Sequence, residues 1–196
     1  MRIIAGAARG TILETLEGED TRPTLERVKE NFFNAINFEL PGAKVLDLFA
    51  GSGQLGLEAL SRGAKEAVFV DANAKCIEII TRNAQKAKLY ERCSILKYDY
   101  ATYLSALKKR KDFEKFDIIF LDPPYKGNRI GCTCVLNIIQ NELLCEGGLI
   151  ICESGNGEQL ALDLDEATAK RIKKTKVYKY GKIYITILTI GESHGE

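Results

Sequence analysis

The stretch FLDPPYKG, residues 120–127, places an acid, two prolines and a tyrosine directly after an apolar run. Proline cannot donate a hydrogen bond to a sheet, so a strand has to end here. A residue that precedes proline is held extended, which restricts the backbone of Asp122 and Pro123. The stretch therefore predicts a stiff corner that presents the Asp122 carboxylate, the Pro123 carbonyl, Pro124 and the Tyr125 ring.

An exocyclic amine on a nucleic-acid base is a group that this corner could hold. Such an amine is a poor nucleophile because its lone pair is delocalised into the ring. The Asp122 carboxylate and the Pro123 carbonyl offer acceptors for its two N–H groups, and Tyr125 offers a face for stacking. Orientation of the amine, rather than a strong general base, would then supply most of the acceleration. A plain turn is the alternative, although turns usually use Gly, Asn or Asp without an aromatic anchor.

A glycine loop with the pattern G-x-G-x-x-G, at Gly51, Gly53 and Gly56, follows the apolar run 45–50. The glycines allow a tight turn and the close approach of a ligand to the start of the next helix. Asp71 ends the next apolar run about twenty residues later, where a carboxylate accepts hydrogen bonds from ribose hydroxyls. A helix cap is the alternative role for Asp71. The pattern predicts a nucleoside-binding loop and fits dinucleotides as well as other nucleosides.

Asp47 argues against a nicotinamide dinucleotide in this loop. It lies in the apolar run just before Gly51, where a dinucleotide loop would continue a hydrophobic strand. A carboxylate under the loop suits a ligand with a positively charged amino or sulfonium group. A nicotinamide enzyme would also need an acid, base or hydroxyl for its substrate, and the chain has the DPPY corner at the corresponding edge.

Short apolar runs alternate with helical patterns from Lys44 onward, which predicts a parallel sheet with helices on both faces. The predicted strands are 45–50, 67–70, 94–96, 116–121 and 149–152, and the predicted helices are 54–62, 74–88, 100–111 and 130–144. Two final strands, 171–180 and 182–190, are separated only by Gly181 and predict an antiparallel hairpin. The expected fold is α/β, with a Rossmann-like, doubly wound, mostly parallel seven-stranded sheet that ends in this hairpin.

The N-terminal part predicts a small extension with a different pattern. Residues 2–5 and 10–13 read as two short strands of a hairpin, followed by an irregular acidic piece. Thr24 is expected to cap a helix over residues 25–39, whose apolar residues fall on one face. We therefore expect a hairpin and helix extension over residues 1–40 and one main domain over residues 41–196.

The composition is that of an ordinary soluble globular protein, with 45% hydrophobic and 28% charged residues and a net charge of +1. No apolar run reaches membrane-spanning length and the first residues lack the apolar core of a signal peptide, so we expect a cytoplasmic protein without membrane contact. The six cysteines form no C-x-x-C pair and the single histidine is His194. We therefore expect no metal, and cysteines that act as small buried hydrophobic residues in a reducing compartment.

Local charge is more informative than the net charge. Residues 108–111 form one basic run, and a second series of cations falls in and just before the final hairpin. The N-terminal part carries further arginines: Arg2, Arg9, Arg22 and Arg27. Contacts with nucleic-acid phosphates are one interpretation of these cations, and an ordinary solvated surface is the other. The stretch Arg22–Thr24 has two interpretations in the same way, as a simple helix cap or as a lid on the cofactor or RNA side.

Three motifs together resemble a known family. VLDLFAGSG, followed by LGLEALSRGA, resembles motif I of Rossmann-like S-adenosylmethionine-dependent methyltransferases, and DPPY resembles their amino-methylating motif IV. With RIIAGAARG, RPTLERVKENFFN and the closing YGKIYITIL, the combination is similar to that of the RsmD family of 16S ribosomal RNA guanine-N2 methyltransferases. The resemblance implies S-adenosylmethionine as cofactor and methylation of the N2 amine of a guanine in 16S ribosomal RNA.

The resemblance also implies roles for matched residues. Four would hold the methionine part of the cofactor: Asp47, Gly51, Ser52 and Gly53. Two more would hold its ribose and its adenine, namely Asp71 and Asp99. The target base would lie against the corner: Asp122, Pro123, Pro124 and Tyr125. The candidate RNA contacts lie in the extension: Arg2, Arg9, Arg22, Thr24 and Arg27.

The substrate implied by the family is an assembled or partly assembled small ribosomal subunit. A base inside a duplex cannot reach the corner, so the target must be unpaired or flipped out. We expect a monomer, because the sequence shows no obvious extra apolar face. Two alternatives stay open: an adenine-N6 methyltransferase on RNA or DNA, which the same corner would serve, and a non-catalytic RNA-binding protein with this fold.

Overall fold

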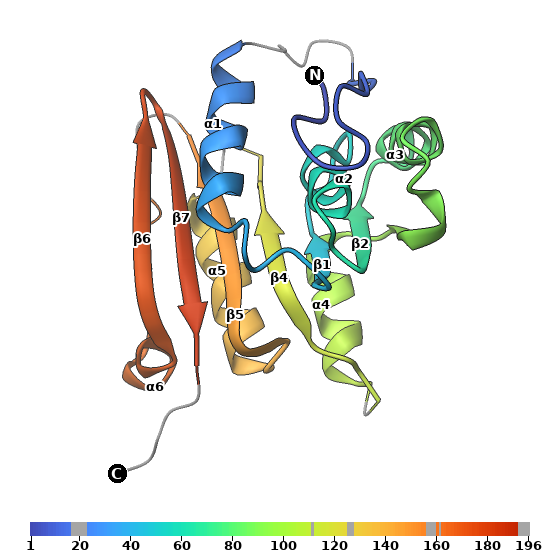
Figure 1. The fold of residues 1–196 in the computed structure, drawn as a ribbon. Helices are drawn as coiled ribbons and strands as arrows, with labels where there is room; N and C mark the ends of the chain where they lie inside the picture. The colour runs from blue at the N-terminus through green and yellow to red at the C-terminus, as the bar shows by residue number, and fades with distance from the viewer. Residues whose placement is uncertain (17–22, 111, 125–127, 156–159, 161, 192–196) are drawn as a thin grey trace. The chain divides into compact units, whose positions relative to one another are not determined.

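The computed structural model in Figure 1 describes the whole chain apart from residues 17–22, 111, 125–127, 156–159, 161 and 192–196. The chain divides into two units, Met1–Tyr100 and Ala101–Glu196. Among the helices that the structure describes, none combines the length and the apolar character needed to cross a membrane.

Three strands form the sheet of the first unit, in the spatial order β3, β2, β1, and both pairings are parallel. The strands are β1 (Lys44–Asp47), β2 (Glu66–Asp71) and β3 (Cys93–Lys97). The helices of this unit are α1 (Pro23–Ala35), α2 (Gln54–Ser61), α3 (Ala74–Lys86) and a short 3-10 helix (Tyr90–Arg92). Consecutive residues of β1, such as Val45 and Leu46, are fully buried. Parallel strands are covered on both faces, which explains why they read as unbroken apolar runs.

Four strands form the sheet of the second unit, in the order β4, β5, β7, β6. They are β4 (Phe116–Leu121), β5 (Leu144–Ser154), β6 (Ile172–Tyr180) and β7 (Ile183–Ile190). Strands β4 and β5 are parallel, whereas β5 with β7 and β7 with β6 are antiparallel. Helix α5 (Asn128–Gln140) connects β4 to β5 and lies behind them in Figure 1. Helix α4 (Tyr100–Lys108) precedes β4, and α6 (Glu166–Lys170) precedes β6.

The predicted fold class is confirmed: a Rossmann-like, mostly parallel set of seven strands alternates with helices and ends in an antiparallel hairpin. Gly181 closes that hairpin with a φ of 63°, a conformation that glycine adopts without strain. The predicted helix 130–144 is too long, since α5 ends at Gln140 and β5 begins at Leu144. Glu142, with a φ of 52°, turns the chain between them. Helix α6 is too short to show a period in the sequence.

Two predictions for the N-terminal part are also wrong in detail. Helix α1 begins at Pro23, which suits the first helical position because its missing N–H would have no partner there. Thr24 therefore lies in the first turn of α1 instead of capping it. The predicted hairpin is reduced to a single antiparallel bridge between Arg2 and Ile12. The division of the chain at residue 40 stays a prediction.

A buried carboxylate on α2 fastens the N-terminal segment, which we define as residues 1–16. Glu58 is 0% exposed. Its two oxygens accept hydrogen bonds from the backbone N–H groups of Ile4 and Ala5, at 2.8 and 3.0 Å. In Figure 1 this segment, in dark blue, loops over α2. The segment is thus held in part through its backbone, at Ile4 and Ala5.

Ser61, one turn further along α2, adds a second attachment. Its hydroxyl accepts from the Ala8 N–H at 2.9 Å and donates to the Ala5 carbonyl. Gly6 passes so close that an added Cβ would collide with the Ser61 carbonyl, and its φ is +83°. Only glycine meets both conditions, which explains the glycine of the IIAGAARG stretch.

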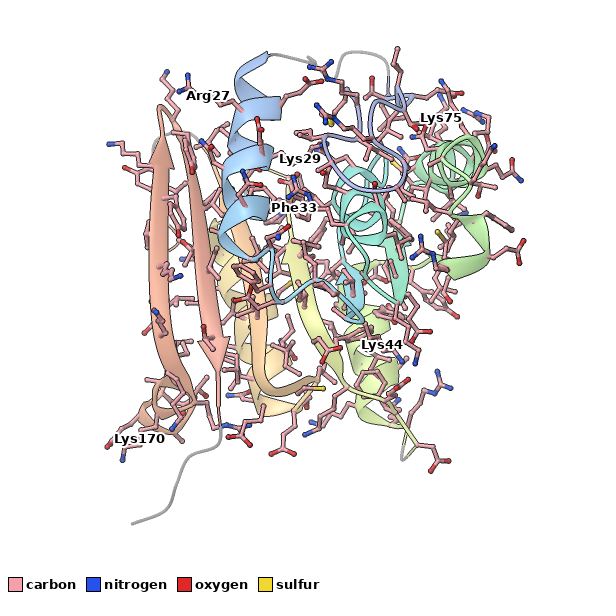
Figure 2. All side chains as sticks on the ribbon, in the orientation of Figure 1. Arg27, Lys29, Phe33, Lys44, Lys75 and Lys170 are labelled. Carbon is pink, nitrogen blue, oxygen red and sulfur yellow. The ribbon has the colours of Figure 1, made fainter. Side chains whose placement is uncertain are left out.

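Helix α1 joins the same carboxylate through Lys29. The Lys29 ammonium lies 3.4 Å from the Glu58 carboxylate and donates to the Arg2 carbonyl at 2.8 Å. Burial lowers the pKa of Lys29, while Glu58 opposes that shift. Arg62 pairs with Glu58 at 2.8 Å and lies over the Phe33 ring. Figure 2 shows Lys29 and Phe33 on the side of α1 that faces α2.

We expect Glu58→Ala to lower the free energy of unfolding by about 3–5 kcal/mol, because it leaves two buried cations and two backbone N–H groups without their acceptor. Urea unfolding measures the loss. Glu66→Ala is the control, since its pair with Lys44 is partly exposed and should contribute less than about 1 kcal/mol. Equal losses in the two variants would contradict the role of Glu58.

Candidate active site

The glycine loop connects β1 to α2 and depends on two left-handed residues. Gly51 and Gly53 have φ values of 53° and 79°. The Gly53 N–H donates to the Ala50 carbonyl at 2.6 Å, which closes the turn, and α2 begins at Gln54. No described atom lies within 4 Å of a Cβ added to Gly51. The backbone of the loop is therefore open to a ligand at this position.

Asp47 ends β1 beneath the loop and is buried. One carboxylate oxygen, Oδ2, accepts from the Gly56 N–H at 2.9 Å. The other, Oδ1, is buried and has no hydrogen-bond partner among the described residues. Burial raises the pKa of Asp47 to about 7, with a further rise from the nearby Asp71 carboxylate and a reduction from the Gly56 hydrogen bond. A buried acceptor in this condition suits a cationic group.

Asp71 ends β2 and orients the loop from the neighbouring strand. Its Oδ2 accepts from the Gly51 N–H at 2.9 Å, and its Oδ1 accepts from the Asn73 N–H at 2.8 Å. Asn73, not Asp71, caps α3, because its side chain accepts from the Lys75 N–H. Each carboxylate oxygen keeps acceptor capacity, so Asp71 is able to hold a ligand hydroxyl in addition.

Asp99 follows β3 and is exposed. The ring of Tyr100, the next residue, lies 5.3 Å from the ring of Phe49. Phe49 belongs to the turn between Asp47 and Gly51. The contact brings the segment after β3 close to the glycine loop. Asp47 and Asp71 are the last residues of β1 and β2, and Asp99 lies just after β3, so all three lie at the carboxyl edge of one sheet.

Asn83 on α3 is a residue of this site that the sequence reasoning missed. Its side-chain amide donates to the carbonyl of Ser52, a buried residue of the loop, at 2.9 Å. The same amide bonds to both backbone groups of Glu14. Its position within the predicted helix 74–88 carried no signal, because an Asn inside a helix is usually a solvated surface residue.

The corner predicted from DPPY follows β4 in the second unit. Asp122 is half-buried, Pro123 is buried and Pro124 is exposed, while Tyr125 lies outside the described residues. Gly131 of α5 packs here, since a Cβ added to it would lie 3.2 Å from Cys152 Sγ and 3.9 Å from Pro123. The Cys152 pKa is raised by burial and by the Asp122 charge. The end of β4, α5 and β5 thus pack closely around Pro123.

The side chains proposed to meet RNA are described at three of the five positions. Arg2 is exposed and pairs with Glu26 at 3.1 Å. Arg9 is exposed in the turn of the N-terminal segment, and Arg27 is exposed on α1, where Figure 2 labels it. Arg22 and the side chain of Thr24 lie outside the described part of the chain. In the second unit, exposed cations line β6: Lys173, Lys174, Lys176 and Lys179.

The described cysteines are all free thiols. Three are buried, as predicted, and three are half-buried: Cys93, Cys132 and Cys145. Burial raises the pKa of Cys93 and of Cys134 to about 12, so these thiols are neutral near pH 7. Within the described residues, no group of three or more His, Cys, Asp or Glu side chains is arranged to hold a metal ion.

Comparison with known proteins places the chain in a family. The model of the family described as "Conserved hypothetical protein 95" matches residues 1–188. The chain belongs to this family. The resemblance to RsmD-family methyltransferases is thereby confirmed.

Two curated relatives and one solved structure illustrate the similarity. "Putative rRNA methyltransferase YlbH" of Bacillus subtilis is 40% identical over 153 residues, which cover 78% of this chain and 82% of the relative. "Ribosomal RNA small subunit methyltransferase D" of Haemophilus influenzae is 34% identical over 181 residues, 92% of this chain and 91% of the relative. The structure "Putative methyltransferase yhhF from Escherichia coli" superposes with a TM-score of 0.81 at 27% identity, covering 97% of this chain and 98% of that one.

We expect Asp47→Asn to gain stability relative to the wild type as the pH rises. The folded state raises the Asp47 pKa from 3.8 to about 7, so folding binds a proton between these values and the wild type loses stability across this window. Below about pH 4 the difference in free energy of unfolding should be small. Above pH 7 it should be constant at no more than roughly 4 kcal/mol.

Thermal or urea unfolding of both proteins at several pH values from 4 to 8 measures this difference. Other titrating groups cancel because they are common to the two proteins. Parallel stability curves over the whole range would contradict the raised pKa.

Proposed function

We propose that this chain transfers a methyl group from S-adenosylmethionine to the N2 amine of a guanine in 16S ribosomal RNA. The observation that carries the proposal is that Asp122, Pro123 and Pro124 directly follow the end of β4, where the Asp122 carboxylate and the Pro123 carbonyl would offer two acceptors to one planar amine. The name of the Haemophilus influenzae relative, "Ribosomal RNA small subunit methyltransferase D", supports small-subunit RNA as the substrate.

The residues of the first unit fit S-adenosylmethionine, which supplies an electrophilic methyl group on a sulfonium centre. Its methionine part carries a positive amino group, and Asp47 Oδ1, which has no partner within the described ranges of the chain, is a buried acceptor that such a cation would satisfy. The open backbone at Gly51, together with Ser52 and Gly53, would hold the same part.

The rest of the cofactor would meet the other two acids. Asp71 has spare acceptor capacity for the ribose hydroxyls, and it already orients the Gly51 N–H. Asp99, exposed after β3, would accept from the adenine amino group. Three acids at the ends of neighbouring strands would thus meet the methionine part, the ribose and the adenine of one cofactor molecule.

The corner acts by orientation. The two N–H groups of the target amine would donate to the Asp122 carboxylate and to the Pro123 carbonyl, which turns the lone pair out of conjugation with the ring. Pro123 and Pro124 restrict the backbone, so little entropy is lost when the amine binds. Tyr125 would stack on the base. The amine proton becomes acidic as the methyl group transfers, so its loss to water suffices and Asp122 stays an acceptor.

The N-terminal extension, residues 1–40, would face the RNA. Arg2, Arg9 and Arg27 are exposed there, and phosphate contacts would position the RNA without reading its sequence. Arg22 and Thr24 complete the proposed set. With a net charge of +1, the chain would take much of its specificity from an assembled or partly assembled small subunit. It would work as a monomer in the cytoplasm.

We expect Asp122→Ala to reduce methyl transfer by about 100-fold or more while leaving the affinity for S-adenosylhomocysteine unchanged. The reason is that the amine loses one of its two acceptors and with it the orientation of its lone pair. Transfer of label from S-adenosylmethionine to small subunits and calorimetric titration with S-adenosylhomocysteine measure the two effects.

The exposed acid Asp112 provides the matched control, and Asp112→Ala should behave as the wild type. Full transfer activity in Asp122→Ala would refute the role of the corner. Loss of cofactor binding in the same variant would show that Asp122 acts on the cofactor instead.

We expect Asp47→Asn to weaken binding of S-adenosylhomocysteine by about tenfold or more, which corresponds to about 1.4 kcal/mol. The wild-type affinity should also fall below pH 7, by up to about tenfold per pH unit, because protonation removes the charge that faces the ligand amino group. Calorimetry at pH 5.5, 6.5 and 7.5 tests this. A pH dependence that persists in Asp47→Asn would assign it to another group.

A further inference from the structure

We propose that Asn83 couples the N-terminal segment to the glycine loop, so that RNA binding and cofactor binding strengthen each other. This inference rests on the proposed function, because it assigns the RNA to the N-terminal segment and the cofactor to the loop. Asn83 acts here as a positioning residue and contacts neither ligand.

The side chain of Asn83 is fully buried, and each of its polar atoms is used. Its Oδ1 accepts from the Glu14 N–H at 2.8 Å. Its Nδ2 donates to the Glu14 carbonyl at 3.0 Å and to the Ser52 carbonyl at 2.9 Å. If either the segment or the loop moves away, a buried polar group of the amide loses its partner, and such a loss is costly.

The helices on both sides of the loop hold the same segment. Helix α2 begins at the loop and binds the segment through Glu58 and Ser61. Helix α3 binds the segment through Asn83 and packs on the loop through Ile80, whose side chain lies 3.2 Å from a Cβ added to Gly53. The segment and the loop are therefore two sides of one hydrogen-bonded assembly.

The coupling follows because RNA and cofactor would restrict the motion of the same hydrogen-bonded groups. RNA phosphates that bind the exposed Arg2 and Arg9 would restrain the segment, and this restrains the Asn83 amide and the Ser52 carbonyl with it. A cofactor that then binds the loop has less motion to remove, so it binds more tightly. Thermodynamic linkage requires the converse effect to have the same size.

The test measures the affinity for S-adenosylhomocysteine with and without saturating small subunits, and the affinity for small subunits with and without saturating S-adenosylhomocysteine. In the wild type we expect each ligand to raise the affinity for the other by the same factor, about 5-fold or more. This factor is the ratio of the affinities with and without the second ligand. In Asn83→Ala the factor should fall towards 1, and only the link through α2 remains.

The neighbouring residue offers a matched control. Arg82 pairs with the Glu14 carboxylate at 2.8 Å on the exposed side of α3, so Arg82→Ala removes a contact to Glu14 without touching the Asn83 amide. This variant should keep the wild-type factor. Loss of coupling in Arg82→Ala as well would overturn the specific role of Asn83.

The outcomes separate this inference from the proposed function. A wild type that binds S-adenosylhomocysteine and small subunits with a factor of 1 would overturn the coupling and leave the proposed function intact. A wild type that binds no S-adenosylhomocysteine would refute the proposed function itself, and the coupling with it.

Amide hydrogen exchange of the wild type tests the coupling even if Asn83→Ala does not fold. Saturation with S-adenosylhomocysteine should slow exchange of the Glu14 amide, which donates to Asn83. The control is the Gly42 amide, which donates to the Gly63 carbonyl at 2.9 Å and should be unaffected. An unchanged Glu14 amide would overturn the inference.

Discussion

The arrangement of the first unit depends on keeping the Glu58 carboxylate buried without an unpaired charge. An ionised carboxylate in a protein interior is costly unless hydrogen bonds and opposite charges compensate it. Here two backbone N–H groups, Lys29 and Arg62 supply that compensation. These partners come from the N-terminal segment, from α1 and from the residue that follows α2. The requirement therefore selects one placement for the segment that carries Arg2 and Arg9, next to the helix that begins at the glycine loop.

Asp47 is the opposite case within the same unit. Its carboxylate is as deeply buried as that of Glu58, yet one of its oxygens has no partner in the described part of the chain. A site built for stability alone would satisfy or replace this group. A site that binds a cation would keep this carboxylate, because the bound ligand then supplies the opposite charge that the carboxylate lacks in the free protein. Stability and function make different demands on a side chain of this kind.

Local patterns in the sequence were sufficient for the existence of the strands, for the glycine loop and for the end of β4 just before Asp122 and the two prolines. Each of these depends on neighbouring residues: an unbroken apolar run, glycines with positive φ, and the restriction that Pro123 and Pro124 impose. The limits of α1 and α5 were missed, because Pro23 at a first helical position and a left-handed Glu142 outweigh the apolar periodicity.

Glu58 and Asn83 were missed for a different reason. Both lie inside helices, where a polar residue usually faces water, and their partners lie 53 and 69 residues away along the chain. Only the tertiary fold brings Ala5 and Glu14 to them. The roles of Asp71, Asp99 and Asp122 in binding stay predictions, although the structure puts each at the end of a strand, where the motif resemblance expects it.

The identity of the methylated nucleoside is the decisive observation for the proposed function. Purified protein and labelled S-adenosylmethionine would be incubated with small subunits from a strain that lacks this gene, and in parallel with deproteinised 16S RNA, before digestion to nucleosides. We expect label in N2-methylguanosine from the subunits. Label in methyladenosine, or no label in either RNA, would contradict the proposed function.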